Sequence, residues 1–108
     1  MPGTTIGRGN VLYDYLIGPN LTPASVGANT SADQNFTIAG LQSGDFVDVN
    51  LQGAQTAGIG IVNAWVSAAN VMTIRFQNST AGALTPAAGI YGINVTRPET
   101  LPLPTNAS

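Results

Sequence analysis

Several short runs of this 108-residue chain alternate between apolar and polar residues, and this period of two most constrains its fold. In the run at residues 45–52, DFVDVNLQ, every second residue from Val47 to Leu51 is apolar. The runs at 70–77 and 89–97, NVMTIRFQ and GIYGINVTR, repeat the pattern. Because successive side chains of a strand point to opposite faces, each run predicts a strand with one buried and one wetted face.

The longest alternating stretch is GIGIVNAWVSAANVMTIRFQN at residues 58–78, where two runs flank the small polar break SAAN. It predicts a β-hairpin at the centre of the fold. The other breaks, at 39–45, 53–58 and 78–89, are rich in Gly, Ser, Asn and Pro, which favour turns. Six or seven short strands separated by such turns predict an all-β protein. The expected architecture is a single small antiparallel β-sandwich or jelly-roll-like domain with extended N- and C-terminal arms.

Composition divides the chain into three parts. Residues 1–20 form a predicted N-terminal arm, and residues 21–97 carry the strand signals of the β-sandwich. Residues 98–108, PETLPLPTNAS, form a proline-containing tail that cannot join a central sheet, because proline has no N–H to donate. In this tail Leu101 and Leu103 are candidate anchors of an extended, polyproline-like segment, and the alternative is disorder.

The run VLYDYLI within the arm has two largely apolar faces. One face carries Val11, Tyr13, Tyr15 and Ile17, whereas the other carries Leu12, Asp14 and Leu16. Such a strand is poorly suited to a solvated edge. It is either an ordinary first strand of the sandwich or a strand that adds to the sheet of a neighbouring subunit.

Few residues carry a charge, and this limits the classes of partner. Charged residues make up 7% of the chain, far below the roughly one quarter that is usual, and the formal net charge is -2. The three basic residues, Arg8, Arg75 and Arg97, are dispersed, so we expect no nucleic-acid partner. With no run of 18 apolar residues and no signal-peptide pattern, we expect no membrane partner either. A nearly uncharged surface is typical of one that partner proteins cover.

The sequence offers little for catalysis. It contains no cysteine and no histidine, so its serines and threonines lack the usual base, and thiolate or imidazole metal ligands are excluded. Asp45 and Asp48 are three residues apart on a predicted strand, which directs them to opposite faces rather than to one proton or cation. We therefore expect no enzyme, no cofactor, no metal and no small-molecule substrate.

Three side chains on polar strand faces or at strand ends are candidate contacts with a partner. Trp65 shares a face with Asn63 and Ser67, so its indole is either a partly covered surface group or an interface anchor. Arg75 and Arg97 either pair locally with an Asp or a carbonyl, or contact another subunit. The candidate interface residues are Val11, Tyr13, Tyr15, Ile17, Trp65, Arg75, Leu101 and Leu103.

Residues 31–98 contain a set of motifs that resembles a β-module of tailed-bacteriophage virion structural proteins. The matching features are FTIAGL, AGIGI, VSAAN followed by TIRF, and NSTAGALTPAAG leading to a tyrosine-containing strand that ends at Arg97. The resemblance implies a capsid decoration (cement) protein. Such a protein sits on the outer capsid surface of the virion, usually as a homotrimer, and ties major capsid proteins together after synthesis in the bacterial host cytoplasm.

Two other functions are compatible with the sequence. A tail-fibre or baseplate module would bind host carbohydrate or another virion protein, and Trp65 with Asn63 is its candidate platform. A head–tail connector would form a ring rather than a trimer.

Overall fold

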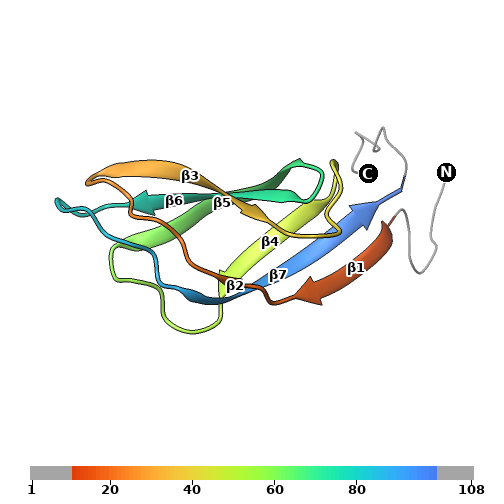
Figure 1. The fold of residues 1–108 in the computed structure, drawn as a ribbon, viewed down its shortest axis with the longest axis horizontal. Coiled ribbons are helices and arrows are strands. Elements are labelled where there is room, and N and C mark those ends of the chain that lie inside the picture. The colour runs from red at the N-terminus through yellow and green to blue at the C-terminus, as the bar shows by residue number, and fades with distance from the viewer. Residues whose placement is uncertain (1–10, 100–108) are drawn as a thin grey trace, which may run out of the picture.

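The computed structural model of the chain describes residues 11–99 and contains seven β-strands in this range. Figure 1 shows the strands in two layers. The strands are β1 (Val11–Ile17), β2 (Asn20–Leu21), β3 (Thr30–Thr37), β4 (Phe46–Leu51), β5 (Ile59–Ala68), β6 (Val71–Asn78) and β7 (Gly89–Pro98). The predicted all-β fold with two antiparallel sheets is confirmed.

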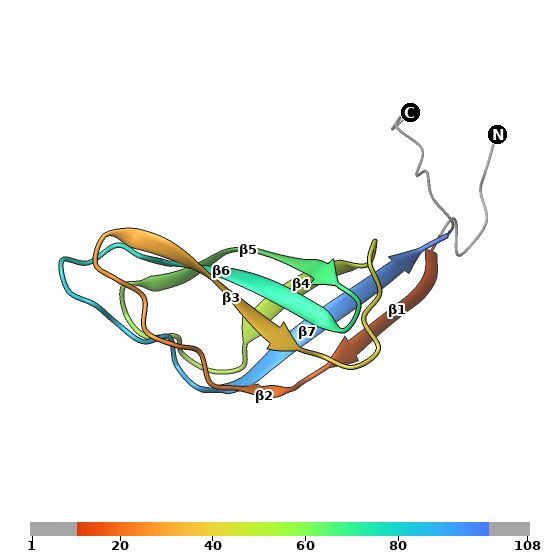
Figure 2. The same cartoon turned by 45° about the horizontal axis from the view of Figure 1, so that its top comes forward.

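Each sheet is built around one central strand. In the first sheet β7 pairs with β4 along one edge and with β1 and β2 along the other. In the second sheet β6 lies between β3 and β5. All of these pairings are antiparallel, and the two sheets pack face to face as a small β-sandwich (Figures 1 and 2).

The predicted alternation is confirmed in the strands that form the core. On β7, Tyr91, Ile93 and Val95 are fully buried and face the second sheet. The corresponding residues of β6 are Met72, Ile74 and Phe76, which are also fully buried. From β4 the core receives Val49, with Val47 and Leu51 packed against it. Two apolar inner faces thus meet, and this burial is the main stabilisation of the fold.

An aromatic pair joins the two sheets. The rings of Phe76 and Tyr91 meet edge to face, with centroids 6.4 Å apart. The buried Tyr91 hydroxyl donates a hydrogen bond of 2.7 Å to the Ala87 carbonyl and accepts one of 3.1 Å from Gln55. The polar end of the tyrosine is therefore satisfied inside the core.

The structure differs from the sequence prediction in two places. The β5–β6 hairpin does not form the centre of the sandwich, because only β6 is a central strand and β5 lies at an edge. Within the predicted arm of residues 1–20, β1 pairs with β7 from Ile17–Ile93 to Val11–Pro98. The sandwich thus begins at Val11 rather than at residue 21, because the partner of β1 is the last strand of the chain. The rest of the predicted arm, residues 1–10, lies outside the described range.

Candidate functional site

The outer face of the second sheet carries a small charged and aromatic group. Arg75 lies between Asp33 on β3 and Asn63 on β5 in the strand register. Its guanidinium donates to both carboxylate oxygens of Asp33, at 2.7 and 3.1 Å, and the hydrogen bond lowers the pKa of Asp33. The same guanidinium lies 5.1 Å from the centroid of the Trp65 ring, a cation–π distance. Arg75 therefore pairs locally, as one of the two sequence interpretations predicts.

The Trp65 ring is partly covered, which is one of the two states that the sequence predicts. It shares the outer face with Asn63 and is half-buried, since Arg75 packs over its ring. Beside it, Thr73 donates to Asn35 at 2.6 Å and lies 2.9 Å from the Ser67 hydroxyl. These neutral contacts cross all three strands, so the polar side chains of this face hydrogen-bond to one another.

Arg97 also pairs within the chain. Its guanidinium forms two hydrogen bonds with the Asp45 carboxylate, at 2.9 and 2.8 Å, and donates a third, of 2.8 Å, to the Gly40 carbonyl. The carboxylate is almost fully buried, and the hydrogen bond from Arg97 lowers the pKa of Asp45. The pair connects the 39–45 turn to the end of β7. The Arg97 guanidinium also lies over the Tyr13 ring, 5.2 Å from the ring centroid.

The outer face of the first sheet is different, because it exposes large apolar side chains. Leu16 on β1, Phe46 on β4 and Ile90 on β7 are 76%, 55% and 45% exposed. All three lie on the face that points away from the core. Leu16 is opposite Asn94 and Phe46 is opposite Thr96, and the even-numbered residues of β7, including Ile90, point away from the core. We call Leu16, Phe46 and Ile90 the apolar face.

The apolar face includes a shallow hollow above a glycine. Gly92 presents bare backbone at the middle of β7, and Leu16, Asn50 and Ile90 line the hollow around it. Hydrophobic groups beside exposed backbone form a surface that a partner side chain can occupy. The outer face of the first sheet therefore exposes apolar side chains together with the carboxylates of Asp14 and Asp48.

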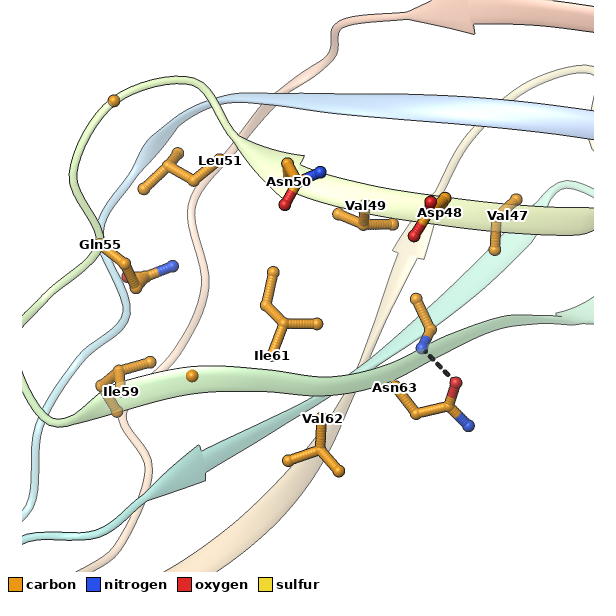
Figure 3. Close-up of a pocket in the computed structure, with 13 residues that line it drawn as sticks. Val47, Asp48, Val49, Asn50, Leu51, Gln55, Ile59, Ile61, Val62 and Asn63 are labelled. Carbon is orange, nitrogen blue, oxygen red and sulfur yellow. Dashed lines mark hydrogen bonds between the residues drawn. The ribbon is translucent and has the colours of Figure 1, made fainter.

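A second opening lies between edge strands of the two sheets. The groove has a volume of about 540 Å³ and is lined by β4 from Val47 to Leu51 and by β5 from Ile59 to Ala64. Figure 3 shows Ile61 pointing from β5 into the space between the strands, whereas Val62 points away. We call this opening the β4–β5 groove.

The predicted interface residues are distributed over different parts of the molecule. Tyr15 and Ile17 pack against the core from β1, Val11 is half-buried opposite Pro98, and Tyr13 is exposed beside Arg97. Trp65 and Arg75 lie together on the other sheet. Leu101 and Leu103 fall outside the described residues. Apart from the four residues of β1, Trp65 and Arg75 are the only described members of this set that lie together.

The apolar face was missed by sequence reasoning. Its residues belong to three strands that are far apart in the sequence, so no single motif contains them. The only signal was the two-sided apolar pattern of VLYDYLI, in which Tyr15 and Ile17 pack against the core and Leu16 is exposed on the outer face. Alternation separates the two faces of a strand but does not say which of them a second sheet covers.

Within residues 11–99 no three His, Cys, Asp or Glu side chains are placed to hold a metal ion. The same residues contain no helix that could cross a membrane. No protein-family model, curated protein or solved structure matches the chain.

Proposed function

We propose that the protein is a non-enzymatic structural component of a bacteriophage virion, a decoration protein that binds the outer capsid as a homotrimer and stabilises contacts between major capsid proteins. The observation that carries the proposal is the apolar face, where Leu16, Phe46 and Ile90 are exposed on the outer side of the first sheet. The motif resemblance of residues 31–98 supports the virion context.

In this proposal the apolar face packs against neighbouring copies, and the chain ends reach other subunits. Burying a side chain such as Leu16 contributes about 1.5–3 kcal/mol, so even a small contact of this kind is useful when it is repeated. A trimer multiplies weak attachments, because the second and third contacts with the shell are effectively intramolecular. No reactive group is needed for this role.

Co-sedimentation with capsids that lack the protein tests the proposal. The full-length protein is expected to bind saturably and to sediment as a trimer in the absence of capsids. Leu16→Ser is expected to weaken trimer formation about tenfold or more, because the buried leucine contact is lost. Val62→Ser is the matched control, since Val62 is a similarly exposed apolar residue of the other sheet.

Two results would count against a decoration protein. One is a folded full-length protein that does not bind the capsids at all. The other is equal weakening of trimer formation by Leu16→Ser and by Val62→Ser, which would show that the apolar face does not hold the copies together.

The carbohydrate-binding alternative receives less support from the geometry. A sugar-binding tryptophan needs an open ring face, but Arg75 already packs over Trp65 and is itself held by Asp33. A glycan-binding assay with Trp65→Ala separates this alternative from the proposed function.

A further inference from the structure

The free edge of β4 is an unpaired ladder within the described part of the chain. In an antiparallel ladder, alternate residues direct their N–H and C=O groups to one neighbour. The Gln52 N–H donates to the Ile90 carbonyl at 2.9 Å, so the even-numbered residues of this strand face β7. It follows that Val47, Val49 and Leu51 direct their backbone groups to the free edge.

The other edges of the sandwich are less suited to strand addition. The edge of β5 is interrupted by a bulge between Ile61 and Asn63, and the Asn63 side chain accepts the Ala64 N–H at 2.9 Å (Figure 3). Beside β3, the Gln34 side chain holds the Ala24 backbone with bonds of 2.7 and 2.8 Å. The β1 register is broken near its start, whereas β4 pairs with β7 without a shift.

The inward side chains of an added strand would meet a groove that has an apolar wall, although Asn50 and Gln55 also line it. The β4–β5 groove lies directly beside the free edge, and Ile59 and Ile61 form its opposite wall. Its volume of about 540 Å³ is within the roughly 300–1,000 Å³ of sites that enclose a ligand. A strand on this edge would therefore cover the groove as well as the ladder.

The C-terminal sequence has the pattern of a strand that pairs on one side only. In TLPLPT, residues 100–105, prolines occupy positions 102 and 104, so the retained N–H groups of Leu101, Leu103 and Thr105 all lie along one edge of an extended chain. Between Leu101 and Thr105 the opposite edge lacks donors, so it would end the sheet. These three donor positions match Val47, Val49 and Leu51, whose backbone groups face the free edge of β4.

We infer that the C-terminal tail of a second copy adds to β4 as an antiparallel edge strand, with Leu101 and Leu103 filling the β4–β5 groove. In an antiparallel ladder, residues that exchange hydrogen bonds lie opposite each other and share a face. Leu101 opposite Leu51 and Leu103 opposite Val49 therefore point inward, and the prolines lie outside, opposite Asn50 and Asp48. The inference rests on the homo-oligomer of the proposed function and names the segment that joins its copies.

The chain's own tail cannot make this ladder. Thr96 lies opposite Phe46, so the chain leaves β7 beside the start of β4, and a returning tail would run parallel to β4. An antiparallel tail must first reach Leu51, five residues or about 17 Å along the strand. Residues 99–101 span at most about 11 Å.

Disulfide trapping between copies tests the pairing, because the chain has no cysteine of its own. In the inferred register Asp48 lies opposite Pro104 in a non-hydrogen-bonded pair, with Cα atoms about 4.5 Å apart, within the disulfide range. Full-length Asp48→Cys and Pro104→Cys proteins are mixed, oxidised and weighed by intact mass spectrometry. The expected product is the mixed dimer, in excess over the product of the control mixture of Asn63→Cys with Pro104→Cys.

A rearrangement of the tail provides the second measurement. Exchanging residues 101–104 from LPLP to PLPL keeps the length, composition and charge but moves the prolines onto the pairing edge. The loss of two backbone hydrogen bonds is expected to raise the dissociation constant of the oligomer about tenfold to hundredfold in sedimentation velocity. The circular dichroism of the sandwich is expected to stay the same, because the exchange lies outside β7.

The inference is overturned if the mixed dimer does not exceed the control, or if the PLPL variant assembles like the wild type. It is also overturned if assembly depends on residues 1–10 and not on the tail. These outcomes are separate from the proposed function: a PLPL variant that assembles like the wild type and binds capsids contradicts tail exchange alone, whereas an intact oligomer that does not bind capsids contradicts decoration alone.

Discussion

At the scale of single residues, a few buried polar groups hold the turns to the sheets. Asn78 is fully buried and donates to the carbonyls of Val26 and Gly82, at 3.1 and 2.8 Å, while it accepts the Thr80 N–H at 2.9 Å. Asp45 does the same for the 39–45 turn through Arg97 and the Gln42 N–H. Each group satisfies backbone that would otherwise be left unpaired near the core.

The Asp45–Arg97 pair predicts a measurable change in acid stability. Asp45→Asn is expected to lower the free energy of unfolding by about 2 kcal/mol at neutral pH, since it leaves a largely buried guanidinium without its carboxylate. Because the folded state lowers the pKa of Asp45 from 3.8, this stabilisation is complete above pH 3.8 and is lost as the pH falls through the lower folded pKa. Urea titrations from pH 7 down to acid are therefore expected to show a gap between wild type and variant that narrows below pH 3.8.

Asp48→Asn is the control for this measurement. Asp48 is exposed on the outer side of β4, so its substitution is expected to change the free energy of unfolding by less than about 0.5 kcal/mol. A gap for Asp45→Asn that is as wide at pH 2.5 as at pH 7 would contradict the role assigned to the carboxylate.

At the scale of the elements, the β5–β6 hairpin depends on one turn residue. Asn70 adopts a positive φ of 63°. Its side chain accepts the Gly40 N–H at 2.8 Å, and its backbone exchanges hydrogen bonds with Ile38 and Leu41, both of 2.9 Å. The turn therefore also holds the segment that connects β3 to β4.

Substitutions at Asn70 separate the two contributions. Asn70→Gly keeps the backbone conformation but loses the bond to Gly40, and is expected to cost about 1 kcal/mol. Asn70→Val adds the strain of a β-branched residue at positive φ, and is expected to cost at least about 1 kcal/mol more. Equal losses in urea denaturation would mean that the backbone conformation contributes little.

The strands themselves were largely predictable from the sequence, but their neighbours were not. The alternation in β4, β6 and β7 identifies the buried side of each strand, because one face of each is uniformly apolar. VLYDYLI has no such asymmetry, and its pairing with β7 joins Val11 to Pro98 across most of the chain. The apolar face arises from such long-range pairing, and the β4–β5 groove arises from the packing of one sheet on the other, so local patterns could not reveal them.

At the scale of the whole molecule, the limits of the sandwich are set by β1 and β7. A fragment of residues 11–99 is expected to melt within about 3 °C of the full-length protein when both are monomeric, since it retains every described strand. A fragment of residues 21–99 is expected to be unfolded, because it lacks Tyr15 and Ile17 at the core and leaves one side of β7 unpaired. Thermal melts by circular dichroism compare them, and a folded 21–99 fragment would contradict this boundary.

The adjacent positions of Val11 and Pro98 have a mechanical consequence. The first and last described strands begin and end side by side, at the right of Figure 1, and run antiparallel. Tension that pulls the two chain ends apart would load one β1–β7 hydrogen bond at a time, starting from this pair, and would peel the strands like a zipper. Tension that pulls both ends in the same direction would instead be shared by the sheet. Such a molecule resists force well only when both of its ends are anchored on the same side.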